Sequence, residues 1–198
     1  PATLTIVTES ADKPYDGKAL TAEGSIEGFV KDETATFTVT GSQTEVGKSD
    51  NTYSLVWDGT AVESDYELDE TIGELEVTTN TTELSVASAD GEWTYDGEAH
   101  TKYEYTVTFG EESYTVTIAE GATTGTATLS TGDVVTITPA EAATITHVAE
   151  STVNNAFTWT VGHEAFYTKG EDTVGTLKVT PATLTIVTES ADKPYDGK

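Results

Sequence analysis

Apolar and polar residues alternate along most of this chain. Residues 34–40 read Thr-Ala-Thr-Phe-Thr-Val-Thr, a period of two that predicts a strand with one buried and one solvated face. The same period recurs in further rows, whose apolar members are Tyr53, Leu55 and Trp57; Leu75 and Val77; Tyr103, Tyr105, Val107 and Phe109; Tyr114, Val116 and Ile118; Val135 and Ile137; and Phe157, Trp159 and Val161. No window has a convincing helical period, so we expect an all-β fold.

Asp-Gly dipeptides separate several of these rows, at residues 16–17, 58–59, 90–91 and 96–97. Such dipeptides supply the positive φ that tight turns need. Short strands joined by turns predict small antiparallel β-sandwiches rather than up-and-down barrels, because a tandem array needs its chain ends at opposite poles. Trp57 and Trp159 each belong to an alternating row, so we expect buried indoles whose truncation to alanine costs about 3–5 kcal/mol.

The chain repeats itself. Residues 181–198 are identical to residues 1–18, and we therefore expect the chain to be a window cut from a tandem array. A shorter motif occurs as Tyr15-Asp16-Gly17, Tyr95-Asp96-Gly97 and Tyr195-Asp196-Gly197. The predicted division is one module at 1–80, a second at 81–180 with an insertion of about twenty residues, and the first strand of the next copy at 181–198.

The joints between these modules are short. Residues 78–82 read Thr-Thr-Asn-Thr-Thr, and residues 180–183 read Thr-Pro-Ala-Thr. Neither is a flexible glycine-serine tether, and the proline fixes one φ angle. We expect an elongated, stiff rod that advances by about 70–90 Å for each repeat.

Composition narrows the possible partners. The 198 residues include 35 acids, nine lysines, no arginine and no cysteine, and their formal net charge is −26. Nucleic acid and anionic lipid would repel such a surface. No apolar run approaches membrane-spanning length, so we expect no membrane insertion in this segment. A high like charge also keeps a long exposed array soluble.

Short patterns at the module edges carry a family likeness. They are Lys13-Pro14-Tyr15-Asp16-Gly17; Asn51-Thr52-Tyr53, Tyr66 and Gly73-Glu74-Leu75-Glu76-Val77; and Asn155-Ala156-Phe157, Tyr167 and Gly175-Thr176-Leu177-Lys178-Val179. These patterns resemble the YDG/MBG-type repeats, immunoglobulin-like modules strung in large numbers in bacterial surface proteins. The likeness covers both modules at their edges and is poor across residues 99–147. It implies an extracellular adhesin stalk on a Gram-positive-like surface, with neighbouring repeats as partners and no catalytic residues.

Candidate chemistry is sparse. The Tyr-Asp-Gly motif could form a platform for sugars, but its recurrence at each joint favours tyrosine packing at a module pole above an Asp-Gly turn. No cysteine nucleophile and no Gly-x-Ser-x-Gly elbow is present, and we expect no enzymatic activity. Acids gather before each closing strand, and the calcium candidates are Asp65, Asp69, Glu70, Glu171 and Asp172. Simple solvation explains these acids as well, so no cofactor is expected, with calcium as the alternative.

The sequence therefore favours a stalk or spacer that projects a binding region from a bacterial cell wall. The alternative is an adhesive module that binds calcium or carbohydrate and contacts host or biofilm glycans or proteins directly. The apolar residues Leu184 and Ile186 lie in the repeated tail. We expect this tail to pair only with sequence that follows it, or to dock on another copy or on its own module.

Overall fold

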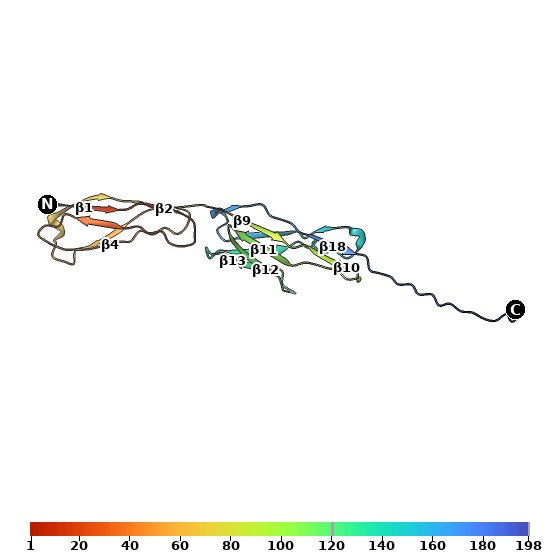
Figure 1. Ribbon diagram of the computed structural model, residues 1–198. Coiled ribbons are helices and arrows are strands. Elements are labelled where there is room, and N and C mark those ends of the chain that lie inside the picture. Colours follow the sequence, from red (N-terminus) through yellow and green to blue (C-terminus); the bar gives the residue numbers. More distant parts are fainter. Residues whose placement is uncertain (120, 198) are drawn as a thin grey trace.

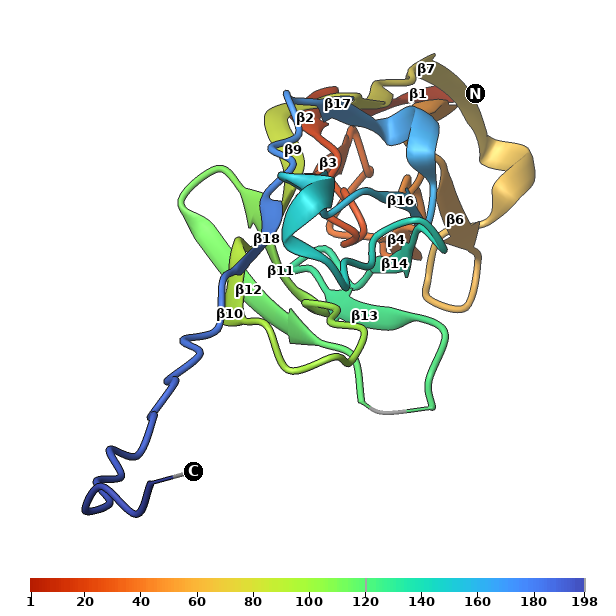
Figure 2. The ribbon, with the colours of Figure 1, turned by 90° about the vertical axis from the view of Figure 1, so that its right-hand side faces the viewer.

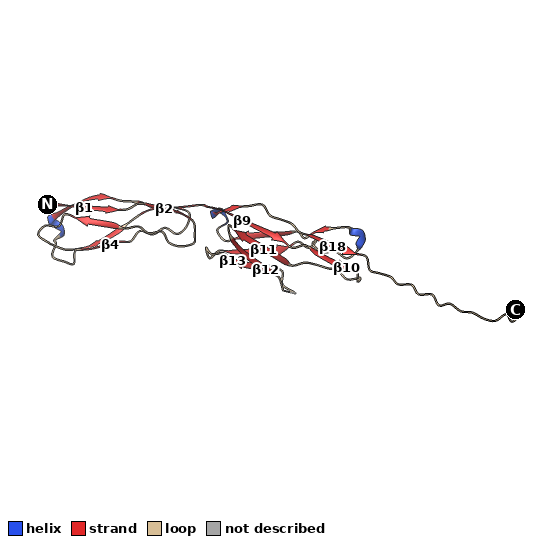
Figure 3. Cartoon of the chain, in the orientation of Figure 1, coloured by secondary structure: helices blue, strands red, loops and turns tan. Residues whose placement is uncertain are grey.

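The computed structural model describes residues 1–119 and 121–197, so that Lys198, the last residue of the expected strand at 181–198, lies outside the described residues. The fold is all-β, as the alternation predicts, and its helical content within the described residues is three short 3-10 turns (Figure 3). None of the described helical segments is long and apolar enough to cross a bilayer. Figure 1 shows two groups of strands one after the other, with the termini at opposite ends.

The first group, here called the N-terminal strand set, contains β1 (Ala2–Thr8), β2 (Ala11–Pro14), β3 (Gly24–Glu27), β4 (Thr36–Val39), β5 (Gly47–Asp50), β6 (Tyr53–Val56), β7 (Tyr66–Thr71) and β8 (Glu74–Thr78). The second, the C-terminal strand set, contains β9 (Asn80–Ser88), β10 (Gly91–Thr94), β11 (Glu104–Phe109), β12 (Glu112–Thr117), β13 (Gly125–Thr128), β14 (Val134–Pro139), β15 (Val153–Asn154), β16 (Phe157–Val161), β17 (Tyr167–Lys169) and β18 (Thr176–Thr180). Within the described residues no β-ladder joins the two sets.

The two sets share one topology. The N-terminal set has the strand orders β3-β1-β7, β2-β8-β5 and β4-β6, and the C-terminal set has β12-β11-β9-β17, β10-β18-β15 and β13-β14-β16. Each ladder of the first set thus has a counterpart in the second, with β9 in the place of β1 and β18 in the place of β8. The additional strands β12 and β13 pair with β11 and β14, and they account for the insertion that the sequence predicts.

The expectation of purely antiparallel sheets is wrong at four strand pairs. The pairs β1–β7, β2–β8, β9–β17 and β10–β18 are parallel. In the first set, β1 and β2 form one run of chain, and this run pairs along its length with the closing run of β7 and β8. In the second set, the run of β9 and β10 pairs in the same way with the run of β17 and β18. Since the first and last strands of a set point the same way, the chain enters a set at one end and leaves it at the other.

Burial follows the predicted strand phases, with one correction. Leu75 and Val77 of β8, and Val135 and Ile137 of β14, are at most 1% exposed. Trp57 and Trp159 point inward but are only half-buried. Trp57 stacks on Tyr66, whereas the indole Nε1 of Trp159 donates to Asp172 Oδ2 at 2.8 Å. The expected alanine penalty of a fully buried indole is therefore too high for both positions.

A buried asparagine closes each set. The side-chain Nδ2 of Asn51 donates to Glu9 O at 2.9 Å, and its backbone N donates to Gly73 O at 2.7 Å. Asn155 makes the same bonds to Ala89 O at 2.9 Å and Gly175 O at 2.7 Å. Both asparagines are 0% exposed. In each set, the asparagine of the Asn-x-aromatic pattern is thus bonded to the glycine of the Gly-x-Leu-x-Val pattern.

Not every Asp-Gly dipeptide forms the predicted turn. Gly17 and Gly97 have φ angles of 75° and 90°, whereas Gly59 and Gly91 are not in the positive-φ region. Gly91 lies in β10, where an added Cβ would stand 2.2 Å from the Trp93 ring. Gly91 lacks a side chain because the Trp93 ring occupies that space, not because the chain turns there. The Asp-Gly dipeptide alone does not distinguish these two roles of a glycine.

The tail at 181–197 forms no strand and leaves the C-terminal set as an extended segment (Figures 1 and 2). Leu184 and Ile186 are 86% and 79% exposed, whereas the identical Leu4 and Ile6 are 0% exposed. Within residues 1–18, β1 pairs with β3 and β7, and β2 pairs with β8, whereas the tail has no such neighbours within the described chain. Docking of the tail on its own strand set, one of the expected outcomes, does not occur in this structure.

Candidate functional site at the joint between the strand sets

Tyr15 connects the two strand sets. It directly follows β2, and its backbone N donates to Thr78 O at the end of β8 at 2.8 Å. Its side chain is 4% exposed and belongs to the same apolar cluster as the core of the C-terminal set. The ring packs edge-on against Phe166 and Tyr167, with centroid distances of 4.9 and 5.8 Å. Edge-to-face aromatic pairs of this kind contribute about 0.5–1.5 kcal/mol each beyond their burial.

Asp133, just before β14, gathers the polar groups of the joint. Its Oδ2 accepts from the hydroxyls of Tyr15 at 3.0 Å and Tyr167 at 2.7 Å, and its Oδ1 lies 2.8 Å from His163 Nδ1. Burial by itself would raise the pKa of this carboxyl, but the bonds from Tyr167, His163 and Tyr15 outweigh it and hold the pKa below its usual value. Asp133 is 9% exposed. The groups that stabilise its charge come from both strand sets, since Tyr15 belongs to the first and Tyr167 and His163 belong to the second.

The same carboxylate acts on Tyr15. Burial, followed by the hydrogen bond to Asp133 and the nearby negative charge, raises the pKa of the Tyr15 hydroxyl to about 12. The hydroxyl therefore remains a hydrogen-bond donor across the neutral range, because its ionised form would face Asp133. Through Asp133, the hydroxyl of Tyr15 is thus bonded to the same carboxylate as Tyr167 and His163 of the other strand set.

The backbone reinforces this contact. The Oδ1 of Asp16 accepts from Lys18 N at 3.0 Å and forms the turn in which Gly17 has positive φ. A Cβ built on Gly17 would stand 1.8 Å from Thr131 O, so only glycine allows the turn to approach the second strand set this closely. Asn80, at the start of β9, donates from Nδ2 to Tyr15 O at 2.8 Å.

His163 completes the joint in an uncommon conformation. Its φ of 50° places it in the left-handed region, and its ring stacks on Phe166 with a centroid distance of 5.1 Å. Such a conformation in a non-glycine residue costs on the order of 1–3 kcal/mol and persists where the surroundings hold it. The recurrence of the tripeptide singles out Tyr15 in the sequence, but no sequence pattern points to Asp133 or His163, which lie 118 and 148 residues away along the chain.

The other copies of the Tyr-Asp-Gly motif are exposed. Tyr95 follows β10 as Tyr15 follows β2, and its N donates to Thr180 O at 2.8 Å. Its side chain is 40% exposed and contacts His147, at a centroid distance of 6.0 Å. Tyr195, in the tail with Asp196 and Gly197, is 96% exposed. The structure therefore places only one of the three tyrosines in a buried joint.

The acids considered for calcium do not gather into a site. Within the described residues no three acidic or histidine side chains lie close enough to hold a metal ion. Asp65 lies in the 3-10 turn before β7, and Asp69 lies on an exposed part of β7. Glu70 accepts from the Tyr53 hydroxyl.

The corresponding acids of the second set are engaged differently. Asp172 Oδ1 accepts from Val86 N at 2.8 Å, while its Oδ2 accepts from Trp159. Glu171 beside it is exposed. Asp172 thus ties the closing segment of the set to β9 and β16, which is a structural use of a residue that the sequence presents as a calcium candidate.

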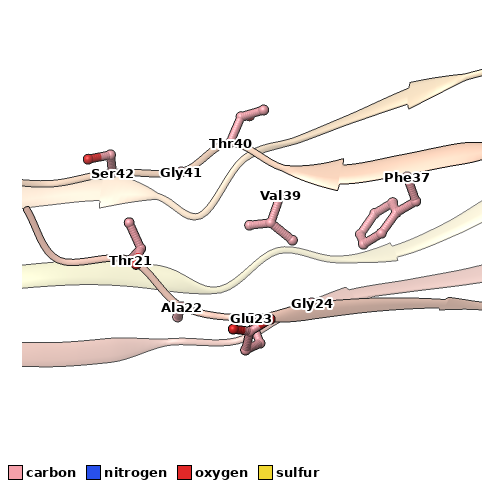
Figure 4. Close-up of a pocket in the computed structure, with 9 residues that line it drawn as sticks. All are labelled: Thr21, Ala22, Glu23, Gly24, Phe37, Val39, Thr40, Gly41 and Ser42. Carbon is pink, nitrogen blue, oxygen red and sulfur yellow. The ribbon is translucent and has the colours of Figure 1, made fainter.

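Among the hollows on the N-terminal strand set, two are lined partly by aromatic side chains. The first, of about 500 Å³, runs between β4 and the segment before β3; Phe37 and Val39 project into it opposite residues 22–24 (Figure 4). The second, of about 480 Å³, is lined by Tyr53 and Leu55 of β6 and by Trp57 directly after it; the acids Asp50, Glu63 and Glu70 also line it. A ring beside carboxylates is an arrangement that can stack on a sugar and accept its hydroxyl bonds.

Comparison with known proteins identifies no relative: no family model, curated protein or solved structure matches this chain.

Proposed function

We propose that this chain is a spacer from a long extracellular protein of a bacterial cell surface, built from two immunoglobulin-like modules in a stiff rod. The modules correspond to residues 1–80 and 81–180, with the tail as the start of a further copy. In this proposal the array holds a binding region away from the cell wall, as the resemblance to YDG/MBG-type repeats implies.

The observation that carries the proposal is the buried joint at Tyr15. A flexible tether between independent domains would leave their facing surfaces wet, whereas Tyr15 is 4% exposed and donates to the buried Asp133 of the other set. Each bond to a charged partner contributes about 1.5–3 kcal/mol. A joint with that energy resists bending, which is what a spacer requires.

Chain direction and charge support the same function. In each set the opening run of two strands is parallel to the closing run of two strands, so the chain leaves a set at the end opposite to its entry and copies can be added in line. The net charge of −26 gives neighbouring arrays a mutual repulsion that keeps them apart.

Small-angle scattering and glycan binding together test this proposal. We expect a scattering profile of an elongated particle whose length does not change when the ionic strength is raised, together with a blank glycan array. A profile of two freely moving bodies would contradict the spacer.

The adhesive alternative rests on the hollow that contains Tyr53 and Trp57. If this surface binds a glycan, Trp57→Ala would abolish binding on the array, while the matched change Trp93→Ala in the other set would leave it intact. Glycan binding that survives both changes would place the site elsewhere. A large rise in melting temperature that calcium causes and magnesium at equal ionic strength does not would add calcium as a partner.

A further inference from the structure

The two poles of the chain that face away from the joint carry matching halves of a second joint. The structure assigns to Tyr95 a partner in another copy of this chain, namely the pair formed by Glu33 and Tyr66 at the far pole of the N-terminal strand set. This inference rests on the proposed tandem array and adds to it the residues that join one repeat to the next.

The donor half is already built. Tyr95 has the same backbone position after β10 that Tyr15 has after β2, with an N–H···O bond of 2.8 Å to the end of the closing strand in both cases. The following turn is also the same, because Asp96 Oδ1 accepts from Glu98 N at 2.9 Å and Gly97 has a φ of 90°. What differs is the neighbour: a Cβ on Gly97 would meet nothing within 4 Å, and the Tyr95 ring is 40% exposed.

The acceptor half lies in the N-terminal strand set. At the first joint a carboxylate before β14 accepts from the tyrosine that begins β17, with 2.7 Å between Asp133 Oδ2 and the Tyr167 hydroxyl. In the N-terminal set Glu33 precedes β4, the counterpart of β14, and its Oε2 accepts from the hydroxyl of Tyr66, which begins β7, at 2.5 Å. The same two side-chain types thus make the same bond at the same place in the fold.

At the Tyr15 joint, the carboxylate of the bonded pair Asp133 and Tyr167 also accepts a hydrogen bond from Tyr15 of the preceding strand set. The corresponding pair of the N-terminal set has no such third partner within the described chain. Glu33 is partly exposed, and its second carboxylate oxygen is the natural acceptor for an incoming tyrosine hydroxyl.

Apolar and charged neighbours fit the same partner. Phe29 and Trp57 flank the Tyr66 ring at centroid distances of 5.8 and 5.9 Å, and they supply the aromatic surface that Phe166 supplies at the first joint. Lys31 is exposed and precedes Glu33 by two residues, as Thr131 precedes Asp133. Since Thr131 meets the turn at Gly17, Lys31 would meet the turn at Gly97 and place its ammonium group beside Asp96.

The partner of Tyr95 in this inference is a second copy of the chain, because the sequence after Thr180 repeats the start of the chain. Residues 181–198 repeat residues 1–18, so that the pole bearing Tyr95 is followed directly by the sequence that begins an N-terminal strand set. Leu184 and Ile186 lack sheet partners, which such a set would supply.

A two-copy protein, in which residues 1–180 are followed by residues 1–198, tests the pairing. The chain has no cysteine, so single spin labels can be placed at Thr158→Cys in the first copy and Ser54→Cys in the second. Both positions are exposed. We expect a narrow distance distribution across the new joint. Tyr95→Ala in the first copy should widen it at least two-fold, and Glu33→Gln in the second copy should widen it as well.

The two-copy protein contains its own controls. Tyr95→Ala in the second copy and Glu33→Gln in the first copy change the same side chains at the free ends, and they should leave the distribution unchanged. Equal widths for the facing and the free-end variants would overturn the assignment. A broad distribution at both joints of the unsubstituted protein would instead contradict the spacer itself, so the two failures are distinguishable.

Discussion

The turn at Gly17 packs closely against the C-terminal strand set, and replacing this glycine tests the joint against a matched position. Gly17→Ala and Gly97→Ala both place a Cβ at positive φ, where an alanine costs about 1–2 kcal/mol. The backbone penalty is common to both. The difference lies in the surroundings, since the new Cβ at Gly17 would stand 1.8 Å from Thr131 O and that at Gly97 would meet nothing within 4 Å.

The size of the difference follows from what must move. Thr131 O is a backbone atom and cannot rotate away, so relief of the overlap requires the strand sets to separate by more than 1 Å. Overpacking of this kind costs about 1–3 kcal/mol, and separation also weakens the contacts of Tyr15. We expect Gly97→Ala to lower the free energy of unfolding by about 1–2 kcal/mol and Gly17→Ala by about 2–5 kcal/mol.

Denaturant unfolding followed by tryptophan fluorescence measures both changes, because Trp57 lies in one set and Trp93 and Trp159 in the other. Small-angle scattering of the same variants reports whether the joint opens. Equal free energies for Gly17→Ala and Gly97→Ala, with unchanged scattering, would refute the close packing of the joint.

Three further predictions concern the joint, the buried asparagine and the tail. The joint should be most stable between about pH 4 and pH 10. Asp133 has a lowered pKa, so its contribution is lost as acid protonates the carboxyl; Tyr15, with a pKa raised to about 12, loses its contribution as the pH rises from 10 toward 12. Melting curves of wild type and Tyr15→Phe across this range should converge at both extremes, and a constant difference would count against this explanation. Asn155→Ala should cost at least about 2 kcal/mol because the part-buried carbonyls of Ala89 and Lys102 lose the donor that Asn155 Nδ2 supplies. The exposed neighbour change Asn154→Ala should stay within about 0.5 kcal/mol, and similar costs for the two changes would contradict a stabilising role for the Asn155 amide. Deletion of residues 181–198 should change the melting temperature by less than about 2 °C, since the described part of this tail buries no core side chain, and loss of the C-terminal set's cooperative transition would show otherwise.

The repeated segment shows which parts of the fold are encoded locally. Lys13 binds Asp16 at 2.6 Å, Lys193 binds Asp196 at 3.0 Å, and Gly17 and Gly197 share a φ of 75°. The turn therefore forms in both copies from neighbouring residues alone. The strand does not, because 2–8 pairs with β3 and β7 while 182–188 has no partner beside it. Alternation predicts that a segment can form a strand, but its partners decide whether it does.

The joint shows the same limit for the candidate site. Tyr15 could be singled out because its tripeptide recurs, which is visible in one sequence. Asp133 is one of 35 acids, and it lies just before β14 in a stretch where no repeated pattern distinguishes it. Its role depends on a contact with a residue 118 positions away, and such a contact follows from the topology rather than from local pattern. The parallel pairs were missed for the same reason, because turn dipeptides predict neighbouring hairpins and contain no information on how first and last strands meet.

The most direct test of the spacer is the distance distribution across the Tyr15 joint in the 198-residue chain. Spin labels at Ser54→Cys and Thr158→Cys place one exposed probe on β6 and one on β16. A stiff joint predicts one narrow distribution that does not change with salt and that widens at least two-fold in Tyr15→Ala. A broad distribution in the otherwise unsubstituted chain, with no further widening in Tyr15→Ala, would contradict the proposal that this joint makes the chain a rigid spacer.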